Sequence, residues 1–275
     1  MVQHLSTLRG SSAEALQAIG ERVDGYSGTL EETGTLGADL FALAAVLRAQ
    51  PALRRAVTDV STPVEARVDL VRNVFEGKVG AAALDLLADA AGRRWLSSRD
   101  LPEALEQVGV SAVVRSAGKR DAGRLADELF TIAQLVEENA DLRIALSDPV
   151  RSIDDKRTML HALLDGRVLP ATTVLVSQAL AGTHRSFHAA VTDYQTVAAA
   201  TYGEGVARVS VAHELSAEQL TRLNDALSRQ YDRPIHLNVE VDPDVVGGMR
   251  VEIGDDVIDG TVAARLDQVR RKLVG

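Results

Sequence analysis

The feature that most constrains the fold is an internal repeat, because the first part of the 275-residue chain recurs 89 positions further on. The heptapeptide LRRAVTD at Leu53–Asp59 returns as LRIALSD at Leu142–Asp148. Between residues 36–79 and 125–168, about ten of the 44 positions are identical. A constant offset through turns as well as helices indicates duplication of one structural unit. Convergent patterning of Ala- and Leu-rich helices is the alternative.

Each copy has the spacing of amphipathic helices. In the first copy, Leu36, Leu40, Leu43 and Leu47 form an apolar stripe at helical intervals, and Leu125 and Leu129 repeat its beginning. Aromatic residues make up 3% of the chain, so the core must be built from Ala, Leu and Val. Such side chains favour closely packed helices. The sequence therefore predicts a mainly α protein.

Local signals predict where the helices begin. Ser11 and Ser12 are expected to cap the first helix, and residues 25–37 read as a connector containing glycine and threonine. Thr62-x-x-Glu65 has the form of a capping box, with Pro63 at the first helical position. Ser152-x-x-Asp155 is a weaker box in the second copy.

We therefore predict two related helical bundles, residues 1–102 and 103–202, followed by a small α/β domain at 203–275. The segment 116–121 (SAGKRD) is the expected break between the bundles.

The last part of the chain has a different pattern. Residues 235–241 alternate apolar and polar side chains as a half-buried strand does. Asp242-Pro243 ends that strand, and the pair Gly247-Gly248 leads into a second strand at 249–253. Paired glycines indicate positive φ or a backbone packed too closely for any Cβ. Asp259-Gly260-Thr261 then opens a helix with Val262, Leu266, Val269 and Leu273 on one face. With a strand near 206–211 and a helix capped by Ser216, the expected order is β-α-β-β-α.

These residues resemble the C-terminal signature of the F-type ATP synthase delta subunit, a family that includes the oligomycin-sensitivity-conferring protein. The resemblance is carried by Asp242, Pro243, Gly247, Gly248, Asp255, Ile258, Asp259, Gly260 and Thr261, in order and at close spacing. It extends back to Gly205. Thr261 stands where serine is commoner in the family, which keeps the hydroxyl. A second bundle is the larger departure, since the family typically carries one.

The resemblance implies a non-catalytic subunit of the peripheral stalk, or stator, with no cofactor and no active site. Its expected partners are the N-terminal helices of the alpha subunit, held in a groove of a helical bundle, and the b subunits of the stalk. It would resist rotor torque during ATP synthesis coupled to hydrogen ion transport. The second copy sits where the family's single bundle sits, so we expect it to be the principal dock. The signature residues are expected to be structural.

Composition agrees with these partners. The formal net charge of −9 argues against a nucleic-acid partner held through phosphates. The chain has no cysteine, no apolar segment of a secretory signal at its start, and no apolar run of about 18 residues. We expect a soluble protein at the cytoplasmic face of the cell membrane, attached to the membrane only through the complex.

Other chemistry finds little support in the residues. His184 and His188 lie one helical turn apart but lack a third metal ligand. Asp242, Asp244, Asp255, Asp256 and Asp259 fit turns and helix starts better than any calcium loop. One alternative stays open: a helical-repeat scaffold whose C-terminal module senses a small molecule, with Gly247-Gly248 approaching the ligand.

Overall fold

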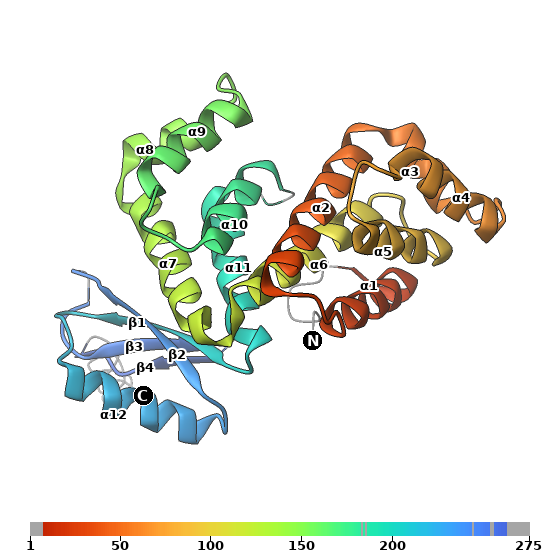
Figure 1. Cartoon of the computed structure of the whole chain (residues 1–275). Helices are drawn as coiled ribbons and strands as arrows, with labels where there is room; N and C mark the ends of the chain where they lie inside the picture. Colours follow the sequence, from red (N-terminus) through yellow and green to blue (C-terminus); the bar gives the residue numbers. More distant parts are fainter. Residues whose placement is uncertain (1–7, 183, 185, 244, 254–255, 263–275) are drawn as a thin grey trace, which may run out of the picture. The chain divides into compact units, whose positions relative to one another are not determined.

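A computed structural model describes residues 8–182, 184, 186–243, 245–253 and 256–262. The chain divides into two compact units, Met1–Thr201 and Tyr202–Gly275. The described part of the first unit is helical, and that of the second is a sheet with one helix (Figure 1). The predicted fold class, mainly α with a small α/β domain at the end, is confirmed.

The first unit contains eleven helices within its described residues. They are α1 (Gly10–Asp24), α2 (Leu30–Ala49), α3 (Pro51–Thr58), α4 (Val64–Phe75), α5 (Ala81–Gly92), α6 (Asp100–Ser116), α7 (Gly118–Glu138), α8 (Ala140–Ser147), α9 (Ile153–Leu164), α10 (Pro170–Ala181) and α11 (Phe187–Thr201). Their apolar stripes face inward, and the leucines at 36, 40, 43 and 47 are all buried.

The 89-residue offset is visible in the helix boundaries. Adding 89 to the bounds of α3, α4 and α5 gives the bounds of α8, α9 and α10 to the residue. The same shift carries α1 onto α6, α2 onto α7 and α6 onto α11 within a few residues. Helix α6 is therefore both the sixth helix of the first set, α1–α6, and the first helix of the second set, α6–α11. The predicted division at residues 102/103 falls inside this shared helix and stays a prediction.

The offset also preserves hydrogen bonds between distant elements. The Asp39 carboxylate of α2 accepts from the backbone N–H of Gly80, ahead of α5, at 2.8 Å. At the corresponding positions, the Glu128 carboxylate of α7 accepts from the N–H of Leu169, ahead of α10, at 2.8 Å. Each carboxylate satisfies a backbone donor that the helix start leaves without an internal partner. Convergent helical patterning does not explain this agreement, whereas duplication of one structural unit does.

Three local predictions in the first copy are wrong. Ser12 does not cap α1. It lies inside the helix, fully buried, where its hydroxyl donates to Asp100 at 2.6 Å and accepts from the N–H of Leu96 at 2.8 Å. The expected connector at 25–37 ends at Thr29, because Thr29 and Glu32 form a capping box that starts α2. The predicted box at Thr62 is absent, and α4 begins after Pro63 without a side-chain cap.

Two other caps are confirmed. The Ser152 hydroxyl accepts from the N–H of Asp155 at 3.1 Å at the start of α9. In the second unit, Ser216 and Gln219 form a reciprocal capping box.

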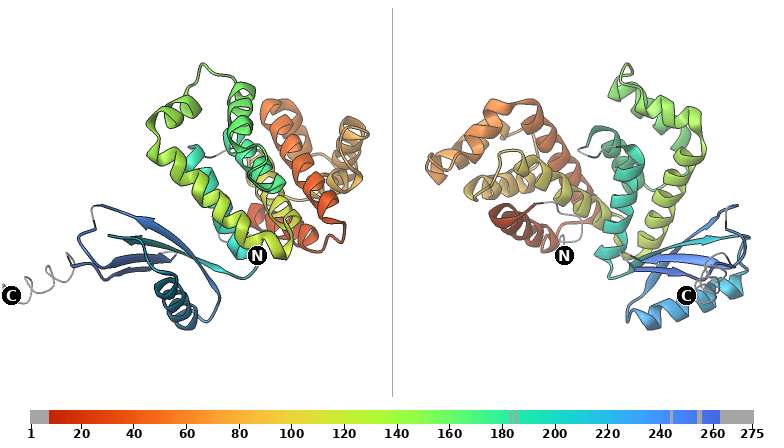
Figure 2. Two further views of the ribbon diagram at one scale, coloured as in Figure 1. Left: turned by 60° about the vertical axis from the view of Figure 1, so that its left-hand side comes forward. Right: turned by 180° about the vertical axis from the view of Figure 1, so that it is seen from behind.

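The second unit contains β1 (Gly205–Val211), α12 (Ala217–Gln230), β2 (Ile235–Val241), β3 (Met249–Ile253) and β4 (Asp256–Asp259). The sheet order is β2-β1-β3-β4, with β1 parallel to β2 and the other neighbours antiparallel. Helix α12 covers one face of the sheet (Figure 2). Its Leu227 is buried with Ala207, Val209 and Val211 of β1.

This topology adds one strand to the predicted order. Strand β4 is not among the predicted strands, and within the described residues it pairs with β3. The predicted terminal helix, with Leu266, Val269 and Leu273, lies outside the described residues.

Candidate functional site

Seven of the residues that carry the resemblance lie in the second unit, in the loop between β2 and β3 and at the end of β4. These signature residues are Asp242, Pro243, Gly247, Gly248, Asp259, Gly260 and Thr261. Because β1 lies between β2 and β3, the loop joining β2 to β3 has to pass the end of β1. Asp242 begins that loop, and its N–H donates to the carbonyl of Val211, the last residue of β1, at 2.9 Å. Val245 then donates to the carbonyl of Asp242 at 3.1 Å, which forms the turn around Pro243.

The glycine pair ends the same loop and packs against the end of β4. Gly247 has φ +77° and Gly248 has φ +84°, a region that L side chains rarely adopt. A Cβ on Gly248 would lie 2.5 Å from the carbonyl oxygen of Gly260 and 2.9 Å from the Cα of Thr261. The sequence predicted either positive φ or a close backbone approach, and Gly248 has both.

Hydrogen bonds fix this approach. Gly260 donates its N–H to the carbonyl of Met249 at 3.0 Å, and Val262 donates to the carbonyl of Gly247 at 3.1 Å. Gly248 therefore approaches the protein's own backbone, and not a ligand as the sensor alternative requires.

Asp259 and Thr261 form a small turn beside the glycines. Asp259 Oδ1 accepts from the Thr261 hydroxyl at 2.7 Å and from the Thr261 N–H at 3.0 Å. Both bonds, the side-chain bond first, lower the pKa of Asp259 below its ordinary value. Thr261 is buried, so its hydroxyl has a structural role that a serine would also supply.

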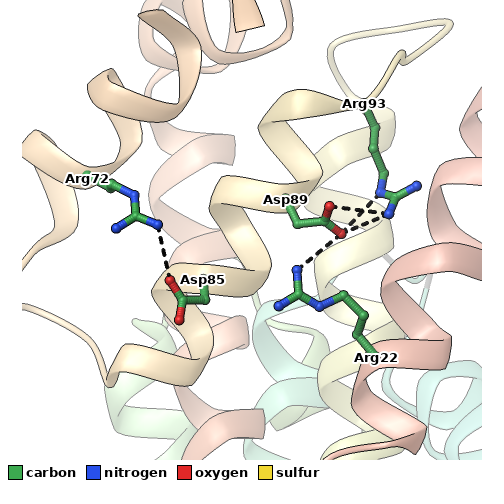
Figure 3. Close-up of polar contacts among 5 residues, drawn as sticks. All are labelled: Arg22, Arg72, Asp85, Asp89 and Arg93. Atoms are coloured by element: carbon green, nitrogen blue, oxygen red, sulfur yellow. Dashed lines mark hydrogen bonds and ion pairs between the residues drawn. The ribbon is translucent and has the colours of Figure 1, made fainter. Parts of the chain in front are cut away.

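The charged side chains around α5 make ion pairs within the first set of helices (Figure 3). Asp89 of α5 contacts Arg93 at 2.9 Å and Arg22 of α1 at 3.5 Å, and Asp85 contacts Arg72 of α4 at 3.4 Å. These side chains are partly or largely exposed, so each pair contributes little to stability. Arg93, the residue after the end of α5, is thus paired with a carboxylate of the helix that it follows.

Exposed apolar side chains are equally frequent in the two sets. In the first unit, large apolar side chains at least 40% exposed are Leu30, Val46, Val60, Val64, Leu96, Leu135, Ile144, Val150, Ile153 and Leu163. Five of these, from Leu135 to Leu163, lie on α7, α8, α9 and the turn before α9. Val46 and Leu135 occupy equivalent positions, as do Val64 and Ile153.

The two histidines that the sequence singled out have separate carboxylate partners. His184 Nε2 lies 3.0 Å from Asp193 Oδ2, and His188 Nε2 lies 3.8 Å from Glu137 Oε2. Among the residues that the structure describes, no group of three or more His, Asp or Glu side chains is placed to hold a metal ion. Asp244 and Asp255 of the acidic cluster lie outside the described residues.

No single helix in the described ranges is both long and apolar enough to cross a membrane. Helices α2 and α3 meet that test only as a pair, bent by 106° where they join.

The fold and these contacts define a helical-repeat protein with a small α/β end module. The family model for the ATP synthase delta (OSCP) subunit matches residues 110–273. That match begins within the shared helix α6 and continues into the second unit. The chain belongs to the ATP synthase delta (OSCP) subunit family, whose members are components of the peripheral stalk.

Individual relatives match over the full length. The ATP synthase subunit delta of a Nocardioides species is 66% identical over 275 residues, covering 100% of both chains. Those of Beutenbergia cavernae and Streptomyces coelicolor are 36% and 38% identical over 274 residues, covering 98% of this chain and 100% and 99% of theirs. A chain in the Toxoplasma gondii mitochondrial ATP synthase hexamer aligns with 60% of this chain and 95% of its own length, at 18% identity and a TM-score of 0.37.

Proposed function

We propose that this stalk subunit is a passive connector with two ends and no active site of its own. The helical unit grips an amphipathic N-terminal helix of an alpha subunit, and the C-terminal module binds the b subunits. The chain lies at the cytoplasmic face of the cell membrane, attached through the complex. In that position it holds the catalytic head fixed while the rotor turns.

The observation that carries this proposal is the family match at residues 110–273, because it covers parts of both compact units. A connector needs two surfaces that belong to separately folded parts. A helix-binding role also suits the exposed apolar side chains of the helical unit, since amphipathic helices bind by laying an apolar face on such surface.

We propose that the second copy is the principal dock for the alpha subunit. The family model supports this choice, because its match at residues 110–273 covers α7–α11 and leaves out α1–α5. For the b subunits, the second unit offers its own exposed apolar side chains: Val241, Val246, Val257, Ile258 and Val262. The signature residues then act indirectly, because they hold the loop and the strand that carry these side chains.

Binding of a synthetic alpha-subunit N-terminal peptide to the full chain tests the proposal. We expect micromolar affinity by isothermal titration calorimetry. Ile153→Asp should abolish binding, whereas Val64→Asp, at the equivalent position of the first copy and equally exposed at 43%, should leave it intact. No binding by the wild-type chain would refute the helix-gripping role. Loss of binding in Val64→Asp alone would assign the dock to the first copy.

A further inference from the structure

A buried charged cluster lies where the two sets of helices meet. Glu106, in the middle of the shared helix α6, is only 2% exposed. Its carboxylate forms an ion pair with Arg48, near the end of α2 in the first set. Its other oxygen accepts from the Tyr194 hydroxyl of α11, in the second set, at 3.2 Å.

Arg48 extends this connection to a third helix. While one end of its guanidinium pairs with Glu106, Nη1 donates to the backbone carbonyl of Ala181, at the end of α10, at 3.1 Å. The next residue, Gly182, leaves room for the carboxylate, because a Cβ there would lie 2.1 Å from Glu106 Oε1. One carboxylate and one guanidinium thus join α2, α6, α10 and α11.

Tyr194 also contacts His184. The His184 ring meets the Tyr194 ring edge to face, with centroids 5.5 Å apart, and pairs with Asp193. Burial raises the pKa of Tyr194 above its ordinary value, and the charge of Glu106 adds to the rise. The phenol therefore remains a hydrogen-bond donor to Glu106 at any ordinary pH.

The cluster is not part of the repeat itself. Glu106 corresponds to Gln17 in the first set and to Gln195 in the second, Arg48 corresponds to Glu137, and Tyr194 corresponds to Leu105. By contrast, the capping carboxylate is repeated: Asp39 supplies it in the first set, and Glu128 supplies it at the corresponding position of the second set. The cluster is therefore specific to the place where the two sets meet, and neither set contains an equivalent of it.

A buried ion pair adds little net stability, because desolvation offsets the attraction, but it is intolerant of other geometries. Two apolar helix surfaces can slide over one another at low cost, whereas a buried carboxylate cannot leave its donors. We propose that the Glu106 cluster is a lock that fixes the angle between the two sets of helices, so that the helical unit is one stiff body. A role for this lock in resisting torque rests on the proposed function, whereas the fixed angle between the two sets does not depend on it.

Distance measurements on the full chain test the lock. The sequence has no cysteine, so spin labels can be placed without removing native residues. Labels at Asp69→Cys on α4 and Thr131→Cys on α7 report between the sets, and labels at Glu14→Cys and Asp69→Cys report within the first set. All three sites are exposed. Double electron–electron resonance should give one narrow distance for each pair in the wild-type background.

Glu106→Gln removes the charge while keeping the shape. We expect it to broaden the distance between the sets and to leave the distance within the first set unchanged. Asp85→Asn, which breaks the exposed pair with Arg72, is the matched control and should change neither. If Glu106→Gln loses its helical circular dichroism, the double variant Arg48→Met, Glu106→Met decides, because apolar replacement of a buried pair usually preserves folding. A distance between the sets that stays as narrow as in the wild type, in whichever variant folds, overturns the lock.

Discussion

Replacing Gly248 by alanine tests whether the signature residues have a structural role, namely packing the loop between β2 and β3 against the end of β4. At φ +84° an alanine adopts a left-handed backbone, which costs about 1–2 kcal/mol. The lower entropy of the unfolded alanine chain returns roughly 0.4–1 kcal/mol of this. The new Cβ would also lie 2.5 Å from the carbonyl oxygen of Gly260. Such overpacking against backbone adds about 1–3 kcal/mol.

Gly203→Ala separates these two costs. Gly203 belongs to the same unit and has φ +77°, but a Cβ there would meet nothing within 4 Å. It should lose roughly 1 kcal/mol, the conformational cost alone. Gly248→Ala should lose about 2–4 kcal/mol, the conformational and steric costs together.

Amide hydrogen exchange followed by mass spectrometry on the full chain measures both variants. The relevant quantity is the opening free energy of the amides in β1 and β3, the paired strands next to Gly248. We expect Gly248→Ala to lower it by at least twice as much as Gly203→Ala, while the helices of the first unit keep wild-type protection. Equal losses in the two variants would refute the close approach of Gly248 to Gly260, and with it the structural account of the signature.

Two further predictions follow from other contacts. Because the pKa of Asp259 is lowered in the folded module, its stabilising effect is present above the unfolded pKa, near 3.8, and is lost as the pH falls through the lower folded value. Acid unfolding of the module, followed by intrinsic tyrosine fluorescence, should become less steep in Thr261→Val, and an unchanged pH profile would contradict this. Asp39→Ala and Glu128→Ala each leave a helix-start N–H without its carboxylate. Each should lower the free energy of unfolding in urea by about 1 kcal/mol, and a loss in only one of the two would contradict the structural equivalence of the copies.

The sequence was sufficient for the repeat because its offset passes through turns as well as helices. It did not reveal that α6 serves both sets, since a helix buried on nearly all sides has a pattern compatible with either. Ser12 was misread as a cap because its partner, Asp100, is 88 residues away. For the same reason Arg48, Glu106 and Tyr194 gave no local signal of a cluster. A single glutamate at a buried position of α6, beside Leu105 and Val108, was the one available hint.

In the second unit, the glycine pair was interpretable from sequence because few other conformations require two adjacent glycines. Its contact with Gly260 was not, since it depends on how β4 returns along β3. Strand β4 itself escaped prediction because its four residues are exposed and show no alternation of burial. Surfaces for partners likewise follow from packing, which decides which apolar side chains stay exposed.

Site-specific photo-crosslinking in the native ATP synthase tests the central claim most directly. A photoreactive amino acid at Ile153, on α9, should capture the alpha subunit, and one at Val246, in the loop after β2, should capture a b subunit. Mass spectrometry of the crosslinked peptides identifies each partner. Capture of the alpha subunit and a b subunit by the two separate units is the expected result. Capture of the same subunit at both positions, or a coupled synthase purified without this chain, would contradict the claim.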